Sequence, residues 1–413
     1  MFKRKQKEHA RVLKQANHLD YPLLITVIIL VIVGLLMVYS GSAIVAVRQG
    51  LEPSFYFMRQ LVWVAVGTVA GYFMYRIDYH IIAKFALPAL VVSIILLITV
   101  LLVNQGNDIK RWIDLGPFPL QPSELAKFTF LLYLSSWLSK HREKRDINKK
   151  EIVYHIKHEL LPFILVLGLV CALIVVQPDL DTMFMLGVTS FVVYFLSGSD
   201  VIHTIGSIAT AIISGIVVLL TTISASYRME RLQTFIDFWK NNTISDPFGA
   251  GYQFRQVLIA VASGGFWGVG FTASTQKYHY LGDTAFSDTI FAIFAEENGM
   301  FGGILLVAAF VFFFLRGYKI AMAAKDKLGY LIAISITTWI TLQAFLHIGS
   351  NVALLPINGN TLPFMSYGGS STIINLMAIG LLLNVAKSAN FNNSARIKTE
   401  PLKKPAIVRR RSR

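Results

Sequence analysis

Apolar stretches close to 20 residues long recur along almost the whole sequence. They lie at residues 22–41, 60–75, 83–103, 124–138, 160–177, 182–198, 201–225, 289–315, 329–349 and 364–386. An α-helix needs about 20 mostly apolar residues to cross the roughly 30 Å hydrocarbon core of a membrane. Helices are the expected spanning element, because lipid does not tolerate unpaired backbone groups and the alternating pattern of a membrane β-barrel is absent. The sequence therefore predicts an all-α integral membrane protein with ten transmembrane helices.

Composition and charge agree with this prediction. Of the 413 residues, 54% are hydrophobic and 15% are charged, whereas soluble domains carry about 25% charged residues. The 38 Lys and Arg residues outnumber the 23 Asp and Glu residues, and many of them gather in residues 1–20, 139–159 and 387–413. Basic loops tend to stay in the cytoplasm. We therefore expect both termini to be cytoplasmic and their charge to face an anionic leaflet rather than nucleic acid.

The chain divides into three parts. Residues 1–20 form a basic cytoplasmic tail, residues 21–387 form the ten-helix membrane domain, and residues 388–413 form a second basic tail. Between the seventh and eighth spans, residues 226–288 form a large extracytoplasmic loop that begins with the spacing of an amphipathic surface helix. The single cysteine, Cys171, lies in the fifth span, which excludes an intramolecular disulfide and paired-cysteine metal sites.

Six motifs in the expected spans and outer loops carry a family resemblance. They are RWIDLGPFPLQPSELAKF (Arg111 to Phe128), QPDL (Gln177 to Leu180), YRMERLQTFIDFW (Tyr227 to Trp239), DPFGAGYQFRQVLIAVASGGFWGVGF (Asp246 to Phe271), SDTIFAIFAEENG (Ser287 to Gly299) and LLPINGNTLPFMSYGGSS (Leu354 to Ser371). In this order they resemble the SEDS family of shape, elongation, division and sporulation proteins, which includes FtsW, RodA and SpoVE. The resemblance runs from about residue 22 to residue 386.

The resemblance implies a ten-helix peptidoglycan glycosyltransferase of the bacterial cytoplasmic membrane, with its active site facing outside. Its substrate would be lipid II and its product undecaprenyl diphosphate. A class B penicillin-binding protein and cell-division membrane proteins would be its partners. The stretch STQKYHYL (Ser274 to Leu281) resembles the division-type FtsW pattern. RodA-type elongation and SpoVE-type sporulation remain the alternatives within the family.

The chain departs from the family pattern at several outer-loop positions. Gly282 and Asp283 replace the usual Pro-Glu, and one additional residue precedes Asp288. Asp181 stands where Gly is usual, and Asn358 and Asn360 occupy positions that are commonly less polar. These departures leave the implied reaction class unchanged, but they predict an altered loop geometry before Asp288.

Asp288, at the outer mouth of the eighth span, is the candidate catalytic base. Extending a glycan requires a sugar hydroxyl to attack an anomeric carbon while a lipid diphosphate leaves, so the site needs a base and cations. Partial burial would raise the pKa of the carboxyl toward a useful value. The residues alone leave a helix N-cap equally open. The resemblance favours catalysis, because Asp288 matches the family's proposed catalytic Asp.

Basic residues in the large loop are the candidate diphosphate ligands. Arg228 and Arg231 share one face of the expected surface helix and offer two planar donors. A solvated or headgroup-facing pair is the alternative, and the resemblance favours substrate binding or loop positioning. Lys277 also lies on the outer side of the membrane. Its sequence position fits contact with the substrate and contact with a lipid headgroup equally well.

Glu124 and Lys127 lie three residues apart at the start of the fourth span. A charge near the bilayer centre costs about 2.5 to 3.5 kcal/mol, so we expect the two to pair or to line a wet substrate cavity. Arg111 is a candidate third member and a candidate substrate ligand. Gln121 is expected to cap the helix or to form a polar wall of the cavity.

Other polar residues inside the spans have a structural and a functional interpretation. Ser366 and Ser370 belong to SYGGSS, whose glycines favour close helix packing and whose hydroxyls could line the substrate cavity. One of Glu296 and Glu297 must face the interior, as a hydrogen-bonded structural acid or a second catalytic group. His347 is interpreted as a satisfied interior histidine, with proton transfer as the alternative.

The sequence requires no cofactor, and no metal ligand is assigned. Asp179, Asp181 and Asp288 could nevertheless supply oxygen atoms to a divalent cation such as Mg or Mn, while Asp179 also suits a turn. Two rival functions stay open. A flippase for lipid II or another anionic lipid would show inner-face motifs and inverted symmetry, and neither is visible. A scaffold that only recruits a penicillin-binding protein would not need Asp288 or the arginines.

Overall fold

The computed structural model describes residues 19–103, 111–114, 116, 119–141, 160–198, 208, 226–244, 246–249 and 251–389. Within these ranges the chain is helical, and its one β-type pairing is an isolated bridge between Ile113 and Leu120. In chain order the elements are α2 (Tyr21–Arg48), α3 (Phe55–Arg76), α4 (Tyr79–Lys84), α5 (Ala86–Val103), α6 (Pro122–His141), α8 (Leu161–Val176), α9 (Leu180–Leu196), α11 (Ser226–Asn241), α12 (Tyr252–Ser263), α13 (Gln276–His279), the 3₁₀ turn η2 (Gly282–Thr284), α14 (Ile290–Met322), α15 (Lys327–Asn351) and α16 (Gly369–Ser388).

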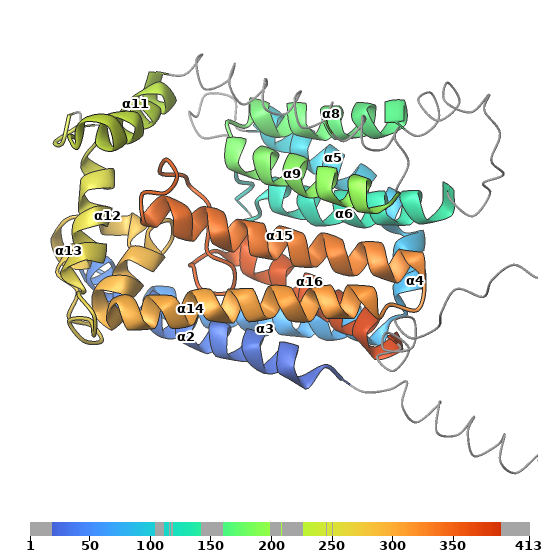
Figure 1. Ribbon diagram of the computed structural model, residues 1–413, viewed down its shortest axis with the longest axis horizontal. Coiled ribbons are helices and arrows are strands. Elements are labelled where there is room, and N and C mark those ends of the chain that lie inside the picture. Colours follow the sequence, from blue (N-terminus) through green and yellow to red (C-terminus); the bar gives the residue numbers. More distant parts are fainter. Residues whose placement is uncertain are drawn as a thin grey trace, which may run out of the picture.

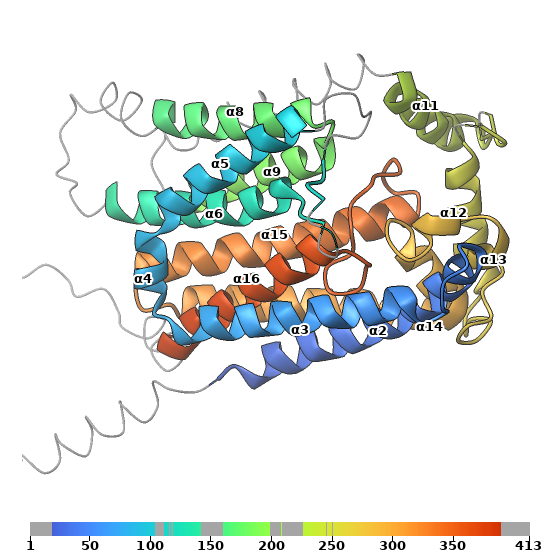
Figure 2. The same ribbon diagram turned by 180° about the vertical axis from the view of Figure 1, so that it is seen from behind.

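The long helices form one bundle. Its members run roughly along a common axis, and α11, α12 and α13 lie together at one end, which we call the loop-rich end (Figure 1). The short helix α4 lies at the other end, near the start of α2 and the end of α16 (Figure 2). We call this the tail end, because residues 1–18 and 390–413, beyond the described residues, continue from it. The first and last described residues therefore share one end of the bundle.

The described helices confirm a multi-pass, all-helical membrane protein. Six of them are long and apolar enough to cross a membrane: α2, α3, α5, α14, α15 and α16. The shorter apolar helices α8 and α9 occupy the fifth and sixth expected spans, and α6 covers the fourth with 20 residues. The seventh expected span, 201–225, lies outside the described residues apart from Ile208. The total of ten crossings stays a prediction.

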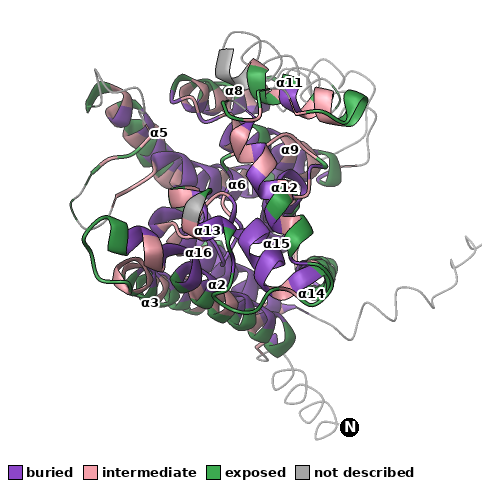
Figure 3. Cartoon of the chain, turned by 90° about the vertical axis from the view of Figure 1, so that its left-hand side faces the viewer, coloured by how far each residue is buried: buried purple, intermediate pink, exposed green. Residues whose placement is uncertain are grey.

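Burial divides the bundle into a core and a periphery. α15 and α16 are mostly buried, whereas α2, α3 and α5 expose many large apolar side chains, such as Ile29, Phe73 and Ile95. Seen from the loop-rich end, buried residues fill the centre and exposed ones the rim (Figure 3). A water-soluble protein rarely exposes so much contiguous apolar surface, so the rim is the surface that faces lipid.

Small residues bring α3 and α16 into close contact. Gly67 and Gly71 are four residues apart on α3, and a Cβ atom added to Gly71 would lie 2.6 Å from the Leu376 carbonyl oxygen of α16. A Cβ atom at Gly380 would lie 2.0 Å from the carbonyl oxygen of Gly71. Close approach through small residues is a common way to hold helices together in lipid, and here it anchors α16 in the core.

The helix that begins at the candidate site is broken after two turns. Gly299 in α14 has φ 68° and ψ −172°, so the regular bonds from residues 300 and 301 back to 296 and 297 cannot form. Instead, Val269 N–H and Gly270 N–H donate to the carbonyl oxygens of Glu296 and Glu297, both at 3.0 Å. Met300 N–H and Phe301 N–H donate to the carbonyl oxygens of Gly265 and Phe266. The loop after α12 thus supplies new backbone partners for residues 296, 297, 300 and 301.

Candidate active site

Asp288 lies at the loop-rich end, two residues before α14, on a segment that is held from two sides. Its carbonyl oxygen accepts a hydrogen bond from Asn351 Nδ2 of α15 at 3.2 Å. The Ser366 hydroxyl donates to the Ser287 carbonyl at 2.7 Å, and Tyr367 N–H donates to the Phe286 carbonyl at 2.9 Å. Ser366 therefore positions the Asp288 segment through its backbone.

A second carboxylate lies beside Asp288. Asp181, in the first turn of α9, accepts a hydrogen bond from the backbone N–H of Gly359 at 2.9 Å. A Cβ atom built at Gly359 would lie 3.6 Å from Asp181 Oδ2 and 3.8 Å from Asp288 Oδ2. The two carboxylates therefore flank Gly359, which is exposed, while both aspartates are half-buried.

Two arginines place positive charge near this carboxylate pair. Burial raises the pKa of Asp288 to about 7; a hydrogen bond with Ser287 lowers it, the Asp181 charge raises it, and the charges of Arg231 and Arg111 lower it. Arg111 is oriented by its own hydrogen bonds to the carbonyl oxygens of Gln177, at 3.1 Å, and of Pro178. A carboxyl with a pKa near neutrality can accept a proton at physiological pH.

Arg231 belongs to α11, which is docked onto the loop-rich end. The indole N–H of Trp239 donates to the Ala353 carbonyl at 2.8 Å, and the rings of Phe238 and Phe254 are 5.3 Å apart. Arg231 is exposed and lines a small pocket together with Thr234, Gln253, Phe254 and Ile357. The side chain of Arg228 lies outside the described residues, so its expected pairing with Arg231 stays a prediction.

Glu124 and Lys127 pair inside the bundle. Lys127 Nζ donates to Glu124 Oε1 at 2.9 Å and to Gln343 Oε1 of α15 at 3.3 Å, and it lies 4.9 Å from the centre of the Trp339 ring. Lys127 is fully buried, and Glu124 Oε2 has no partner among the described residues. The structure thus shows the expected pair, with Gln343 as its third member rather than Arg111.

Gln121 and Ser370 join α6, α9 and α16. The Gln121 backbone N–H donates to the Ser370 hydroxyl at 2.9 Å, and its side-chain amide donates to Asp179 Oδ2 at 3.1 Å. Ser123 donates to the same Asp179 oxygen at 2.8 Å, and Asp179 caps α9 by accepting from Thr182 N–H. In this arrangement the side chains of Gln121, Ser123, Asp179 and Ser370 hold the helix ends in place around the site.

Lys277 lies at the loop-rich end but is buried away from the carboxylate pair. Its ammonium group donates to Glu297 Oε1 at 2.5 Å and to the Ser40 hydroxyl at 2.7 Å. The adjacent Glu296 accepts from the Ser274 hydroxyl at 2.5 Å and from Thr275 N–H at 2.9 Å. Both glutamates are hydrogen-bonded, and together they fasten α13 to α14.

Only one of the two ring nitrogens of His347 has a hydrogen-bond partner among the described residues. Its Nδ1 lies 2.7 Å from the Asn360 carbonyl oxygen, so this nitrogen carries the proton, whereas the buried Nε2 has no partner among the described residues.

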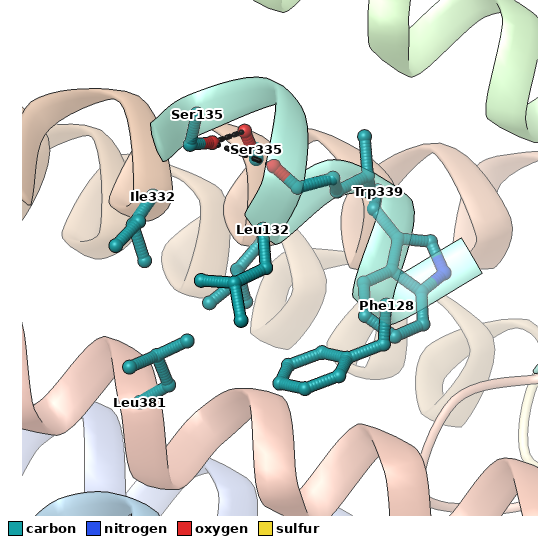
Figure 4. A pocket seen from close by; sticks show the side chains of 9 residues that line it. Phe128, Leu132, Ser135, Ile332, Ser335, Trp339 and Leu381 are labelled. Atoms are coloured by element: carbon teal, nitrogen blue, oxygen red, sulfur yellow. Dashed lines mark hydrogen bonds between the residues drawn. The ribbon is translucent and has the colours of Figure 1, made fainter. Parts of the chain in front are cut away.

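A separate pocket lies further along the bundle between α6, α15 and α16 (Figure 4). Its lining is apolar except for Ser135 and Ser335, whose hydroxyls are 3.0 Å apart.

The described residues gather no group of three metal-ligating side chains. Asp179, one of the three candidates for a divalent cation, is already engaged by Gln121, Ser123 and Thr182. Asp181 and Asp288 remain as the two carboxylates that could face a substrate. A divalent cation at this site stays a prediction.

Only part of this arrangement can be predicted from the sequence. Asp288, Arg111 and Arg231 come together as expected for a site that needs a base and cations. The sequence marks Asp181 as a departure from the family pattern and as a possible oxygen ligand, and it does not single out Gly359. A second carboxylate in the first turn of a helix that Asp179 already caps is the signal that could have identified Asp181.

Comparisons with known proteins agree with these observations. The family model of cell cycle proteins of the FtsW, RodA and SpoVE type matches residues 21–391. The chain is 34% identical to stage V sporulation protein E of Bacillus subtilis, over 90% of this chain and 98% of the relative. It is 33% identical to the probable peptidoglycan glycosyltransferase FtsW of Trichlorobacter lovleyi, over 89% of this chain and 93% of the relative.

A solved structure has a similar fold. It comes from a study of the structural coordination of polymerization and crosslinking by a peptidoglycan synthase complex. The superposition has a TM-score of 0.69 at 26% sequence identity, and it covers 89% of this chain and 98% of the other.

Proposed function

Because the chain belongs to the FtsW, RodA and SpoVE family of cell cycle proteins and is a peptidoglycan glycosyltransferase, we propose that it polymerises lipid II into glycan strands at the outer face of the cytoplasmic membrane. The observation that carries the proposal is Asp288, a carboxyl with a pKa of about 7 at the loop-rich end, with Arg231 and Arg111 close enough to influence its charge.

Each group has a role in the transfer. Asp288 accepts the proton of the attacking sugar hydroxyl while the hydroxyl oxygen bonds to the anomeric carbon of the lipid-linked donor. The bond between that carbon and the lipid diphosphate breaks, and the leaving diphosphate takes the electron pair. Arg231 and Arg111 stabilise its negative charge. Asn351 and Ser366 hold the Asp288 segment in position through its backbone.

The test is glycan chain formation from lipid II by the purified full-length protein, alone and with a co-expressed class B penicillin-binding protein. The Asp288→Asn variant should lose about 100-fold or more of the activity, because general base catalysis contributes 10² to 10⁴ in rate. Asp283→Asn is the matched control, since this exposed carboxylate lies in the same segment. Normal activity in Asp288→Asn would refute the assignment of the base.

The same assay separates polymerase from flippase. Lipid II that moves across a liposome bilayer without forming polymer would favour the flippase. Loss of polymer in Asp288→Asn, with unchanged recruitment of the penicillin-binding protein, would also exclude a pure scaffold.

We place the enzyme in septal wall synthesis, with a class B penicillin-binding protein and other division proteins as partners. The division-type stretch from Ser274 to Leu281 and the FtsW relatives support the first part, and the likeness to a chain of a peptidoglycan synthase complex supports the second. Depletion of the protein in its native cell should give filaments. Rounded cells would point to elongation, and a defect confined to spores would point to sporulation.

A further inference from the structure

Asp181 has no part in the reaction as described, although it lies beside the proposed base. Asp179, not Asp181, caps α9, so Asp181 is not needed to start its helix. Among the described residues, its hydrogen-bond partner is the neutral backbone N–H of Gly359. The Asp181 carboxylate therefore lies next to Asp288 without being used as a helix cap, and the charges of Arg111 and Arg231 act on both carboxylates.

The surroundings of Asp288 limit which groups can act on its charge. α9 contributes Asp181, α11 contributes Arg231, and the segment before α6 contributes Arg111. α15 contributes the neutral Asn351, and residues 352–368 carry no ionisable side chain other than Tyr367. Asp181 is therefore the acidic neighbour that opposes the two arginines.

Resting on the function proposed above, we propose that Asp181 is a positioning residue of the active site. It places a second negative charge across Gly359 from Asp288, and thereby keeps Asp288 able to accept the proton of the attacking hydroxyl at neutral pH.

The physical reason is the balance of charges around the base. The arginines favour the charged form of Asp288 and thereby oppose the effect of burial, because cations lower the pKa of a carboxyl. A like charge disfavours that form and raises the proton affinity. A catalytic base works best when its pKa lies near the operating pH, so Asp181 offsets the cations that the leaving diphosphate requires.

The test is the pH dependence of polymerisation by the full-length protein, compared among wild type, Asp181→Asn and Asp283→Asn. Asparagine keeps the oxygen that accepts from Gly359 N–H and removes only the charge. The acidic limb of the Asp181→Asn profile should therefore move to lower pH by about half a unit to one and a half units, as expected for charges several ångströms apart in a partly solvated site. The rate at high pH should fall several-fold, and Asp283→Asn should keep the wild-type limb.

Gly359→Ala is a second test variant, and it should shift the acidic limb of the pH profile in the opposite direction. The added methyl group would stand at ordinary contact distance from both carboxylates, so it fits without strain while excluding water between them. Less screening strengthens the repulsion between the carboxylates, and the acidic limb should move to higher pH.

Infrared titration of the protonated carboxyl band, assigned as the band that Asp288→Asn removes, measures the same proton affinity without turnover. A midpoint that moves to lower pH in Asp181→Asn supports the proposal, even if the protein forms no polymer. The absence of polymer would count against the proposed function alone. An unmoved midpoint and limb overturn the proposal. So does complete loss of activity in Asp181→Asn with an unmoved midpoint, because Asp181 would then contact the substrate itself.

Discussion

Two buried lysines of the described residues each pair with a glutamate and also reach a third polar group. Lys127 contacts Glu124 and Gln343, and Lys277 contacts Glu297 and Ser40. Burying a charge is costly unless it is paired and hydrogen-bonded. Through the third group, each pair joins helices that are distant in the chain, α6 with α15 and α13 with α2, so its contribution is to fix which helices meet.

Removing one partner of the Lys127 pair should destabilise the bundle strongly. In Lys127→Met the Glu124 carboxylate loses its cation in a buried position, and breaking a buried pair in this way costs about 3 to 5 kcal/mol. The double variant Glu124→Gln with Lys127→Met should recover most of the loss, because no charge remains unpaired. Thermal unfolding in detergent measures both, and a double variant no more stable than Lys127→Met would contradict the charge explanation.

The two pairs differ in how far the sequence could predict them. Glu124 and Lys127 are three residues apart on one helix, where side chains are neighbours, so their pairing follows from local geometry. Lys277 meets Glu297 across two elements and Ser40 from the start of the chain. That contact depends on tertiary packing, and the sequence pattern indicated only that Lys277 lies near the outer side. The position of Asp181 across Gly359 from Asp288 depends on tertiary packing for the same reason.

At the scale of elements, the break in α14 has the largest consequence for the site. The first two turns of α14, which follow Asp288, are buried on all sides and are joined to the loop after α12 through backbone hydrogen bonds. The position of Asp288 therefore depends on the loop at residues 264–270 as well as on α15.

Apolar length predicted the existence of α14, but not its interruption. Residues 289–315 have the composition of one continuous span, and glycine is tolerated inside membrane helices. Only the tertiary approach of Gly268 to Glu297 and Gly299 shows why the regular bonds are exchanged. The large loop was expected to begin with one surface helix, and the structure adds α12 and α13.

Gly268→Ala should disturb this junction far more than Gly265→Ala. Both glycines have positive φ, at 83° and 55°, so alanine at either position costs about 1 to 2 kcal/mol of backbone strain. A Cβ atom at Gly268 would also lie 2.2 Å from the Glu297 carbonyl oxygen, whereas one at Gly265 meets nothing within 4 Å. The Gly268→Ala variant should therefore show a lower Tm in detergent and faster proteolysis between α12 and α14. Equal effects in the two variants would show that the close approach contributes nothing.

At the scale of the whole molecule, charge and fold point to one orientation. The first and last described helices, α2 and α16, which adjoin the basic terminal segments in the sequence, begin and end at the tail end, while the Asp288 site, α11, α12 and α13 lie at the loop-rich end. Positive segments stay in the cytoplasm, and a polymerase of exported lipid-linked sugars needs its site on the other side. The expected orientation thus has the loop-rich end outside, in agreement with the proposed function.

Cysteine labelling in intact cells tests this orientation directly. In a Cys171→Ala background, Leu354→Cys introduces a thiol at an exposed position of the loop-rich end, and Lys84→Cys introduces one at an exposed position of the tail end. A membrane-impermeant maleimide should label the Leu354→Cys variant in intact cells and the Lys84→Cys variant only after permeabilisation, because the bilayer separates the two ends. The reverse pattern would place Asp288 in the cytoplasm, where lipid II is made rather than polymerised, and the proposed function would then fail at its first requirement.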